Sequence, residues 1–200
     1  PVDAEVSQAG TVDGNWLVQA KGRYFTLEDL LGDADLARRF RGGSFATLYL
    51  SPRDYHRIHM PVTGSLERMI HIPGRLFSVN HATTRAVPRL FARNERIVNL
   101  FGTPAGPAAV ILVGAIFVGS MDTVWAGTVT PMERRVSQWR YDGEKSSPVR
   151  LDRGQEMGRF NMGSTVILLF PPGRVGWSDQ FVAGSTVRVG EPIGRLEVPA

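Results

Sequence analysis

The chain has 200 residues, of which 42% are hydrophobic, and this is enough to bury the core of one globular domain. It has no cysteine, which excludes disulfides, thiolate nucleophiles and zinc–thiolate sites. The net charge of +4 comes almost entirely from arginine, which suits phosphate-bearing partners, but no basic block or aromatic–basic motif indicates nucleic acid.

Short β-like runs separated by glycine and proline dominate the chain, and two brief helical patterns interrupt them. Thr26 is a typical N-cap for a helix over 26–31, because acidic residues follow it in the first turn. A second helix is expected over 33–40. The expected strands lie over 5–8, 15–22 (joined to the first by a turn at Asp13-Gly14), 45–50, 62–74, 76–80, loosely 90–101, 108–121 (one or two strands), 124–130, 136–141 and 165–170.

This pattern predicts a mainly β (α+β) fold with an antiparallel, barrel-like core related to barrel-sandwich carrier domains and with short helical insertions. The tail over 184–196, broken by glycines, is similar to the tails of lipoyl- and biotinyl-type domains. Neither Lys21 nor Lys145 has the neighbours of a carrier lysine, so a carrier role is disfavoured. The longest apolar segment, 108–121, is too short for a membrane-spanning helix.

The step Gly163-Ser164, which precedes the apolar run 166–170, is a candidate for backbone self-cleavage. Glycine leaves its carbonyl uncrowded, and the hydroxyl of the next residue can attack that carbonyl. Attack gives an ester, and elimination followed by hydrolysis leaves a ketone-bearing pyruvoyl group at the new N-terminus. Taken alone, such a triplet with Thr165 is more often a turn or a strand entry.

His56 and His59 are the candidate bases near this chemistry. Imidazole is suited to taking a proton near neutral pH, and a carboxylate is suited to orienting the imidazole. Asp3, His59 and Ser164 would form such a triad. The alternative carboxylates are Asp54 and Asp122.

Two other readings of these residues are disfavoured. A zinc site would need His71 or His81 as a third ligand, and the glutamate of a His-Glu-x-x-His motif is missing. We expect packing or surface roles for His71 and His81. The Gly-x-Ser-x-Gly elbow of serine hydrolases is absent around Ser164.

Over its whole length the chain resembles the bacterial phosphatidylserine decarboxylases, a pyruvoyl-dependent, self-cleaving family. The resemblance rests on ordered blocks rather than on any single motif. One departure is Ala4, where the family usually has glycine. The blocks are 1–3, 50–61, 73–80, 90–96, 124–128, 155–160 and Gly163-Ser164-Thr165, where the family cleaves itself.

The resemblance implies a decarboxylase that converts phosphatidylserine to phosphatidylethanolamine and CO2, through a Schiff base to a pyruvoyl group formed from Ser164. Cleavage would divide the single domain, 1–200, into a β chain (1–163) and an α chain (164–200). His59, oriented by Asp3, would be the base for self-cleavage. His56 would serve decarboxylation, as a proton donor or as a contact to the substrate carboxylate.

The resemblance also implies a lipid pocket that is apolar beside the reactive carbonyl and cationic near the phosphate. It implies a homodimer, peripheral on the cytoplasmic face of the inner membrane and facing anionic lipid, with an N-terminal membrane-associated segment missing from this chain. No metal ion is expected. The alternatives are a non-enzymatic barrel module that binds anionic lipid and a serine hydrolase that uses Ser164. The expected lining residues are His56, Phe77, Leu76, Met60 and Arg75.

Overall fold

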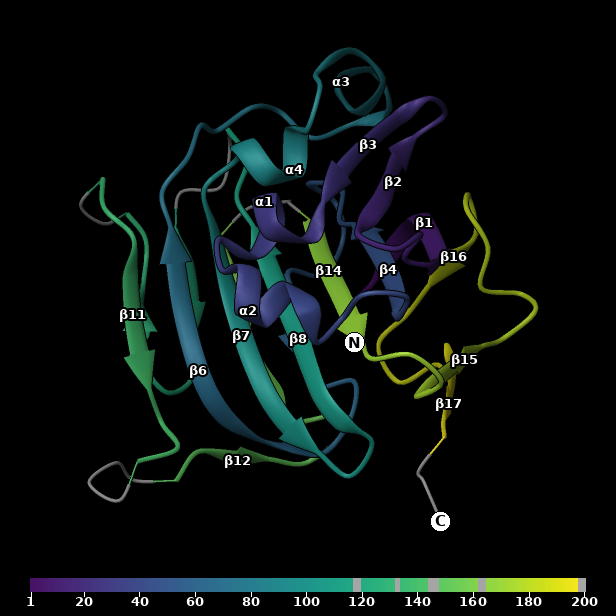
Figure 1. Cartoon of the computed structure of the whole chain (residues 1–200). Coiled ribbons are helices and arrows are strands. Elements are labelled where there is room, and N and C mark those ends of the chain that lie inside the picture. The colour runs from purple at the N-terminus through teal and green to yellow at the C-terminus, as the bar shows by residue number, and fades with distance from the viewer. Residues whose placement is uncertain (117–119, 132–133, 144–147, 162–164, 198–200) are drawn as a thin grey trace.

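A computed structural model describes the chain except for residues 117–119, 132–133, 144–147, 162–164 and 198–200 (Figure 1). The strands are β1 (Ala4–Thr11), β2 (Trp16–Ala20), β3 (Arg23–Thr26), β4 (Ser44–Tyr49), β5 (Arg57–His59), β6 (Gly64–Ile72), β7 (Arg96–Thr103), β8 (Gly106–Val113), β9 (Met121–Thr123), β10 (Gly127–Thr128), β11 (Ser137–Arg140), β12 (Arg150–Leu151), β13 (Glu156–Phe160), β14 (Thr165–Phe170), β15 (Val175–Trp177), β16 (Thr186–Val187) and β17 (Gly194–Leu196). The helices are α1 (Leu27–Leu31), α2 (Ala34–Arg38), α3 (His81–Ala86) and α4 (Leu90–Arg93).

A nine-stranded antiparallel sheet forms the frame of the described chain. Its strands run in the order β11-β6-β7-β8-β14-β4-β1-β16, and β12 pairs with β6 off this path. The central strands are continuously apolar because both of their faces are covered, and every residue of β14 is buried. In the register of these strands, Ile167 of β14 lies between Thr47 of β4 and Ile111 of β8.

Helices α1 and α2 cover one face of this sheet, and Figure 1 shows them in front of its central strands. Thr26 caps α1 by accepting a hydrogen bond from the amide of Asp29 at 3.0 Å, and Asp33 caps α2 in the same way. Buried Arg96 of β7 donates to the carbonyls of Asp29 and Leu30, each at 2.6 Å, and so ties α1 to the sheet. Burial lowers the pKa of Arg96 to about 10, which still leaves it charged at neutral pH.

A second sheet has four strands in the order β10-β9-β13-β5. The pairs β2–β3 and β15–β17 complete the described strands. Strands β13 and β14 are consecutive in the chain but belong to different sheets. The connection between them, residues 161–164, therefore joins the small sheet to the large one.

The prediction of a mainly β fold with antiparallel strands and short helices is confirmed. The described strands form open sheets and no closed barrel, so the likeness to barrel domains is limited to strand content. The strand expected over 76–80 is wrong, because Asn80 instead caps α3 with a capping box. The run 90–101 begins as α4 before it becomes β7, since α4 packs its buried side chains toward α1 and β3. The expected first hairpin is also wrong, because β2 pairs with β3 and β1 pairs with β4.

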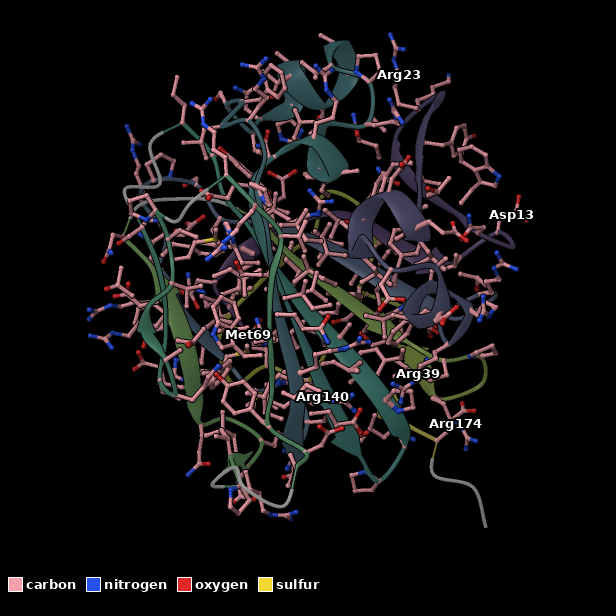
Figure 2. All side chains as sticks on the ribbon, turned by 60° about the vertical axis from the view of Figure 1, so that its left-hand side comes forward. Asp13, Arg23, Arg39, Met69, Arg140 and Arg174 are labelled. Atoms are coloured by element: carbon pink, nitrogen blue, oxygen red, sulfur yellow. The ribbon has the colours of Figure 1, made fainter. Side chains whose placement is uncertain are left out.

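Charged side chains are spread around the molecule. Figure 2 shows Arg23 at the opposite end of the view from Arg39, Arg140 and Arg174, whereas Met69 of β6 is buried. No helix among the described residues has the length and apolar character needed to cross a bilayer. Any anion site must therefore be sought in the local arrangement of arginines.

Candidate active site

The predicted cleavage step lies on the connection between β13 and β14. Residues 162–164, which include Gly163 and Ser164, are outside the described residues, so the site is defined by what flanks them. Phe160 ends β13 in the four-stranded sheet, and Thr165 begins β14 in the nine-stranded sheet. The candidate bond thus joins two sheets that differ in composition and burial.

Thr165 is fully buried, and its hydroxyl has no hydrogen-bond partner among the described residues. A buried hydroxyl in this state is unusual, because it has lost water without a replacement. Tyr49 lies opposite Thr165 in β4. Burial, reinforced by the carboxylates of Asp54 and Glu5, raises the pKa of Tyr49 and keeps its phenol protonated. The first described residue after the connection and its partner in β4 thus both carry neutral hydroxyl groups.

His59 ends β5, a strand that pairs with β13. Its Nδ1 lies 2.8 Å from the carbonyl oxygen of Gly154, and because a carbonyl can only accept, Nδ1 carries the proton. The Tyr55 hydroxyl lies 3.1 Å from Nε2 of His59, and the Tyr55 ring stacks on the imidazole with ring centroids 5.7 Å apart. In neutral His59 the lone pair is therefore on Nε2, the nitrogen that can act as a base.

A β-bulge lies opposite His59. Strand β13 pairs Glu156 with His59 and resumes its register at Gly158, so Met157 is the extra residue. A Cβ atom at Gly158 would lie 2.4 Å from the carbonyl oxygen of Asp122, which explains the glycine. Bulges redirect side chains and are frequent beside active sites. This bulge fixes how β5 meets β13 at the end that carries His59.

His56 precedes β5 and is half-buried. Its Nε2 donates to the carbonyl of Ser51 at 3.0 Å, and its own carbonyl accepts from the amide of Phe160 at 2.9 Å. The second hydrogen bond ties His56 to the last residue of β13. The segment carrying both histidines is thus bonded to the strand that leads into the cleavage step.

Asp3 lies on the segment that runs beside β5. The amide of His59 donates to the carbonyl of Pro1 at 2.8 Å, which holds the two segments together. Oδ1 of Asp3 accepts from the amide of Val189 in the tail at 2.8 Å. Among the described residues, the hydrogen bonds of the His59 ring go to Tyr55 and Gly154, and none joins it to Asp3.

The alternative carboxylates are engaged elsewhere. Asp54 accepts from the amide of Ser51 at 2.7 Å and so closes a local turn. Asp122 pairs with Arg159 at 2.8 Å. We carry Asp3 forward because its segment is hydrogen-bonded to the backbone of His59.

The two remaining histidines have ordinary partners. His71 is buried and lies 2.9 Å from a carboxylate oxygen of Glu95, and exposed His81 lies 3.2 Å from Glu5. The residues that the structure describes contain no group of three or more side chains that could hold a metal ion.

The expected lining residues divide into two groups. Arg75, Leu76 and Phe77 are consecutive and accessible, and Leu76 is 42% exposed. The guanidinium of Arg93 lies over the Phe77 ring, 4.8 Å from its centroid. Met60, by contrast, is 2% exposed and belongs to the hydrophobic core.

Sequence reasoning missed Asn94, which fixes the lining segment in place. Buried Asn94 accepts from the amide of Phe77 at 3.0 Å and donates to the carbonyls of Phe77 at 2.9 Å and Gly114 at 2.8 Å. Gly114 directly follows the end of β8, where Val113 pairs with Thr165. An asparagine between two apolar runs was the only available signal. Tyr55 was also missed, although it directly precedes His56 in the sequence.

Fold and flanking residues together define a class: a β-rich domain in which the strand before a Gly-Ser step is hydrogen-bonded to a segment that carries two histidines. A family model described as "Phosphatidylserine decarboxylase" matches residues 1–195. The chain belongs to the phosphatidylserine decarboxylase family.

Individual relatives agree with this assignment. The chain is similar to proteins named "Phosphatidylserine decarboxylase proenzyme" from three bacteria. These are from Azotobacter vinelandii (55% identical over 199 residues, 99% of this chain and 70% of the relative), Ectopseudomonas mendocina (53% over 199 residues, 99% and 70%) and Bordetella pertussis (56% over 194 residues, 96% and 65%). The resemblance noted in the sequence, and with it the prediction of a decarboxylase, is confirmed.

Proposed function

We propose that the chain is a phosphatidylserine decarboxylase that cleaves itself between Gly163 and Ser164. Cleavage gives chains 1–163 and 164–200 and turns Ser164 into a pyruvoyl group. The observation that carries the proposal is that the strand leading into this step is hydrogen-bonded to the segment with His56 and His59. Bases are thus available beside a bond whose chemistry requires them.

In self-cleavage, Oγ of Ser164 attacks the carbonyl carbon of Gly163, and the amide C–N bond breaks to give an ester. The hydroxyl proton passes to a base and then to the released nitrogen, so no further reactant is needed. His59 is that base, and it acts through Nε2 once the Tyr55 hydroxyl no longer donates a hydrogen bond to this nitrogen. Asp3 orients the segment that carries His59. Elimination from residue 164 then releases the Gly163 carboxylate, and hydrolysis with loss of ammonia leaves the ketone.

The surroundings of residue 164 suit such a group. The unpaired, buried hydroxyl of Thr165 is a donor available to an adjacent carbonyl, and the pairing of β14 on both sides holds the backbone still. When present, the ketone supplies an electron sink for loss of CO2 from an amine-bearing substrate. His56 then delivers a proton to the substrate carbon.

Mass spectrometry of the denatured protein tests this function. Wild-type protein should give two masses, with a hydrazine-reactive carbonyl on the smaller piece, and Ser164→Ala should remain one chain. Ser185→Ala, at an exposed serine of the tail, is the matched control and should cleave normally. His56→Ala should cleave but release little CO2. One unbroken wild-type mass would refute the proposal.

We further propose that the enzyme acts as a homodimer on the cytoplasmic face of the inner membrane. The net charge of +4 supports attraction to anionic lipid. Sedimentation with vesicles that contain phosphatidylserine, compared with neutral vesicles, tests the membrane contact. Analytical ultracentrifugation tests the dimer, and a monomer at micromolar concentration would contradict it.

A further inference from the structure

A hollow of about 430 Å³ opens beside the lining segment. Its volume is in the range of small-molecule sites. Its described lining includes three arginines and no acidic residue. The lining residues are Pro73, Gly74, Arg75, Arg93 and Arg134.

The three arginines have no acidic partner among the residues that the structure describes. Arg38, Arg57 and Arg159 show the usual alternative, since each forms an ion pair with a carboxylate. Arg93, by contrast, donates only to the carbonyl of Pro88 at 3.3 Å and lies over the Phe77 ring. The positive charge of the hollow is therefore not neutralised by the described chain.

The backbone beneath the hollow is tightly fixed. A Cβ atom at Gly74 would lie 2.5 Å from the carbonyl oxygen of Arg93, so only glycine permits this approach. The amide of Arg75 donates to the carbonyl of Arg93 at 2.8 Å, and the amide of Glu95 donates to the carbonyl of Arg75 at 2.9 Å. Arg75 and Arg93 therefore project from adjacent, immobilised backbones, which reduces the entropy lost on binding.

The segment that carries Arg75 also lies near the strands that flank the cleavage connection. A Leu76 side-chain carbon lies 3.4 Å from where a Cβ of Gly114 would be, and a Met121 carbon lies 3.5 Å from the same point. Met121 pairs with Phe160, and Val113, next to Gly114, pairs with Thr165. Leu76 thus lies beside the strands that hold both described ends of the cleavage connection. Arg75, which lines the hollow, directly precedes Leu76 in the chain.

We propose that Arg75, Arg93 and Arg134 form a phosphate-binding subsite that takes the phosphodiester of the lipid substrate; this rests on the proposed function. Guanidinium groups bind phosphate oxygens through paired, charge-assisted hydrogen bonds. A phosphodiester bound here would hold the amino acid end of the headgroup toward residue 164.

Steady-state kinetics with dispersed short-chain phosphatidylserine tests the subsite. Arg75→Gln and Arg134→Gln should each raise KM about tenfold, as expected for loss of one charge-assisted contact, with kcat within about twofold. Arg38→Gln is the matched control, because it removes the same charge from an exposed ion pair on α2. A KM in the subsite variants equal to that of Arg38→Gln would overturn the proposal, as would a fall in kcat at unchanged KM.

Two inhibitors separate the possible sources of phosphate. Glycerophosphoserine should compete with the lipid, and Arg75→Gln should weaken its inhibition about tenfold, whereas L-serine should be unaffected by the substitution. Inhibition by inorganic phosphate that does not compete with the lipid would instead indicate a separate anion site and overturn the headgroup assignment.

Self-cleavage provides an internal check on each variant. If Arg75→Gln is not processed, Arg75→Lys is tested instead. This variant should be processed, and its KM should lie above that of wild type but below the tenfold increase expected for a lost contact. If neither is processed, Arg75 acts in folding or cleavage and the subsite proposal is wrong. Failure of the proposed function looks different, because wild-type protein would then neither cleave nor release CO2.

Discussion

The two sheets differ in what their side chains do. In the nine-stranded sheet, β14 is buried at every position and lies between two apolar neighbours. In the four-stranded sheet, β13 and its neighbours carry ion pairs, Arg57 with Glu156 and Arg159 with Asp122. The centre of the first sheet, β14 and β8, is an apolar frame, and the second sheet presents polar groups, among them His59, at its edge.

The candidate bond joins these two sheets, and the difference explains why that location suits self-cleavage. A frame buried on both faces holds Thr165 still, because any shift of β14 would disturb close packing. A polar sheet tolerates the half-exposed histidines and the β-bulge beside them. Phe160, before the candidate bond, is hydrogen-bonded to the histidine segment, and Thr165, after it, is anchored in the frame.

The largest expected effect comes from removing the base on the polar side. His59→Ala should slow self-cleavage about 10²- to 10⁴-fold, because the Ser164 hydroxyl then has no positioned proton acceptor. The rate is measured as appearance of the smaller chain by denaturing mass spectrometry. His81→Ala, at an exposed histidine that pairs with Glu5, is the control and should cleave at the wild-type rate. Normal cleavage in His59→Ala would remove His59 from the mechanism.

The frame is tested by a cavity in β14. Leu168→Ala should lower the free energy of unfolding by about 2–5 kcal/mol, because Leu168 is fully buried between Ala46 and Val110. The measurement is urea unfolding in a Ser164→Ala background, which keeps the protein a single chain. Val182→Ala, at a 56% exposed site, should cost less than about 1 kcal/mol. Equal losses in the two variants would show that β14 is not the stabilising frame.

The apolar frame was the part of the fold most open to prediction from the sequence. The run over 166–170 and the cap at Thr26 depend on local pattern, and the structure has both. The segment 76–80 was mispredicted because its conformation depends on distant contacts. Gly74 presses against the backbone of Arg93, and buried Asn94 holds Phe77, so residues far along the chain decide its path.

The site was predictable only in its residue types. The histidine motif and the Gly-Ser step could be read directly, and the family assignment followed from their order. The placement of Tyr55 on His59 and the meeting of Arg75, Arg93 and Arg134 around one hollow come from tertiary structure. No periodicity links those positions, so a pattern in the sequence could not reveal them.

A smaller effect is expected where the two regions meet, at Tyr55. Tyr55→Ala removes both the stack and the hydrogen bond on His59 and should slow self-cleavage about tenfold. Tyr55→Phe keeps the stack and frees the Nε2 lone pair of His59, so it should cleave at least as fast as wild type. The same cleavage assay measures both variants. Slower cleavage in Tyr55→Phe than in wild type would mean that the hydroxyl has a role of its own in proton transfer.

The smallest effect is expected in the polar sheet away from the histidine ring. Glu156→Gln breaks the ion pair with Arg57, whose contacts are 2.6 and 2.7 Å long, yet it should cost less than about 1 kcal/mol because both side chains are partly exposed. The difference from the parent should shrink further in 1 M salt, where exposed charges are screened. Urea unfolding in the Ser164→Ala background measures it beside Leu168→Ala. A loss of unfolding free energy as large as that of Leu168→Ala would show that the four-stranded sheet also stabilises the molecule. The proposed difference between the two sheets would then be wrong.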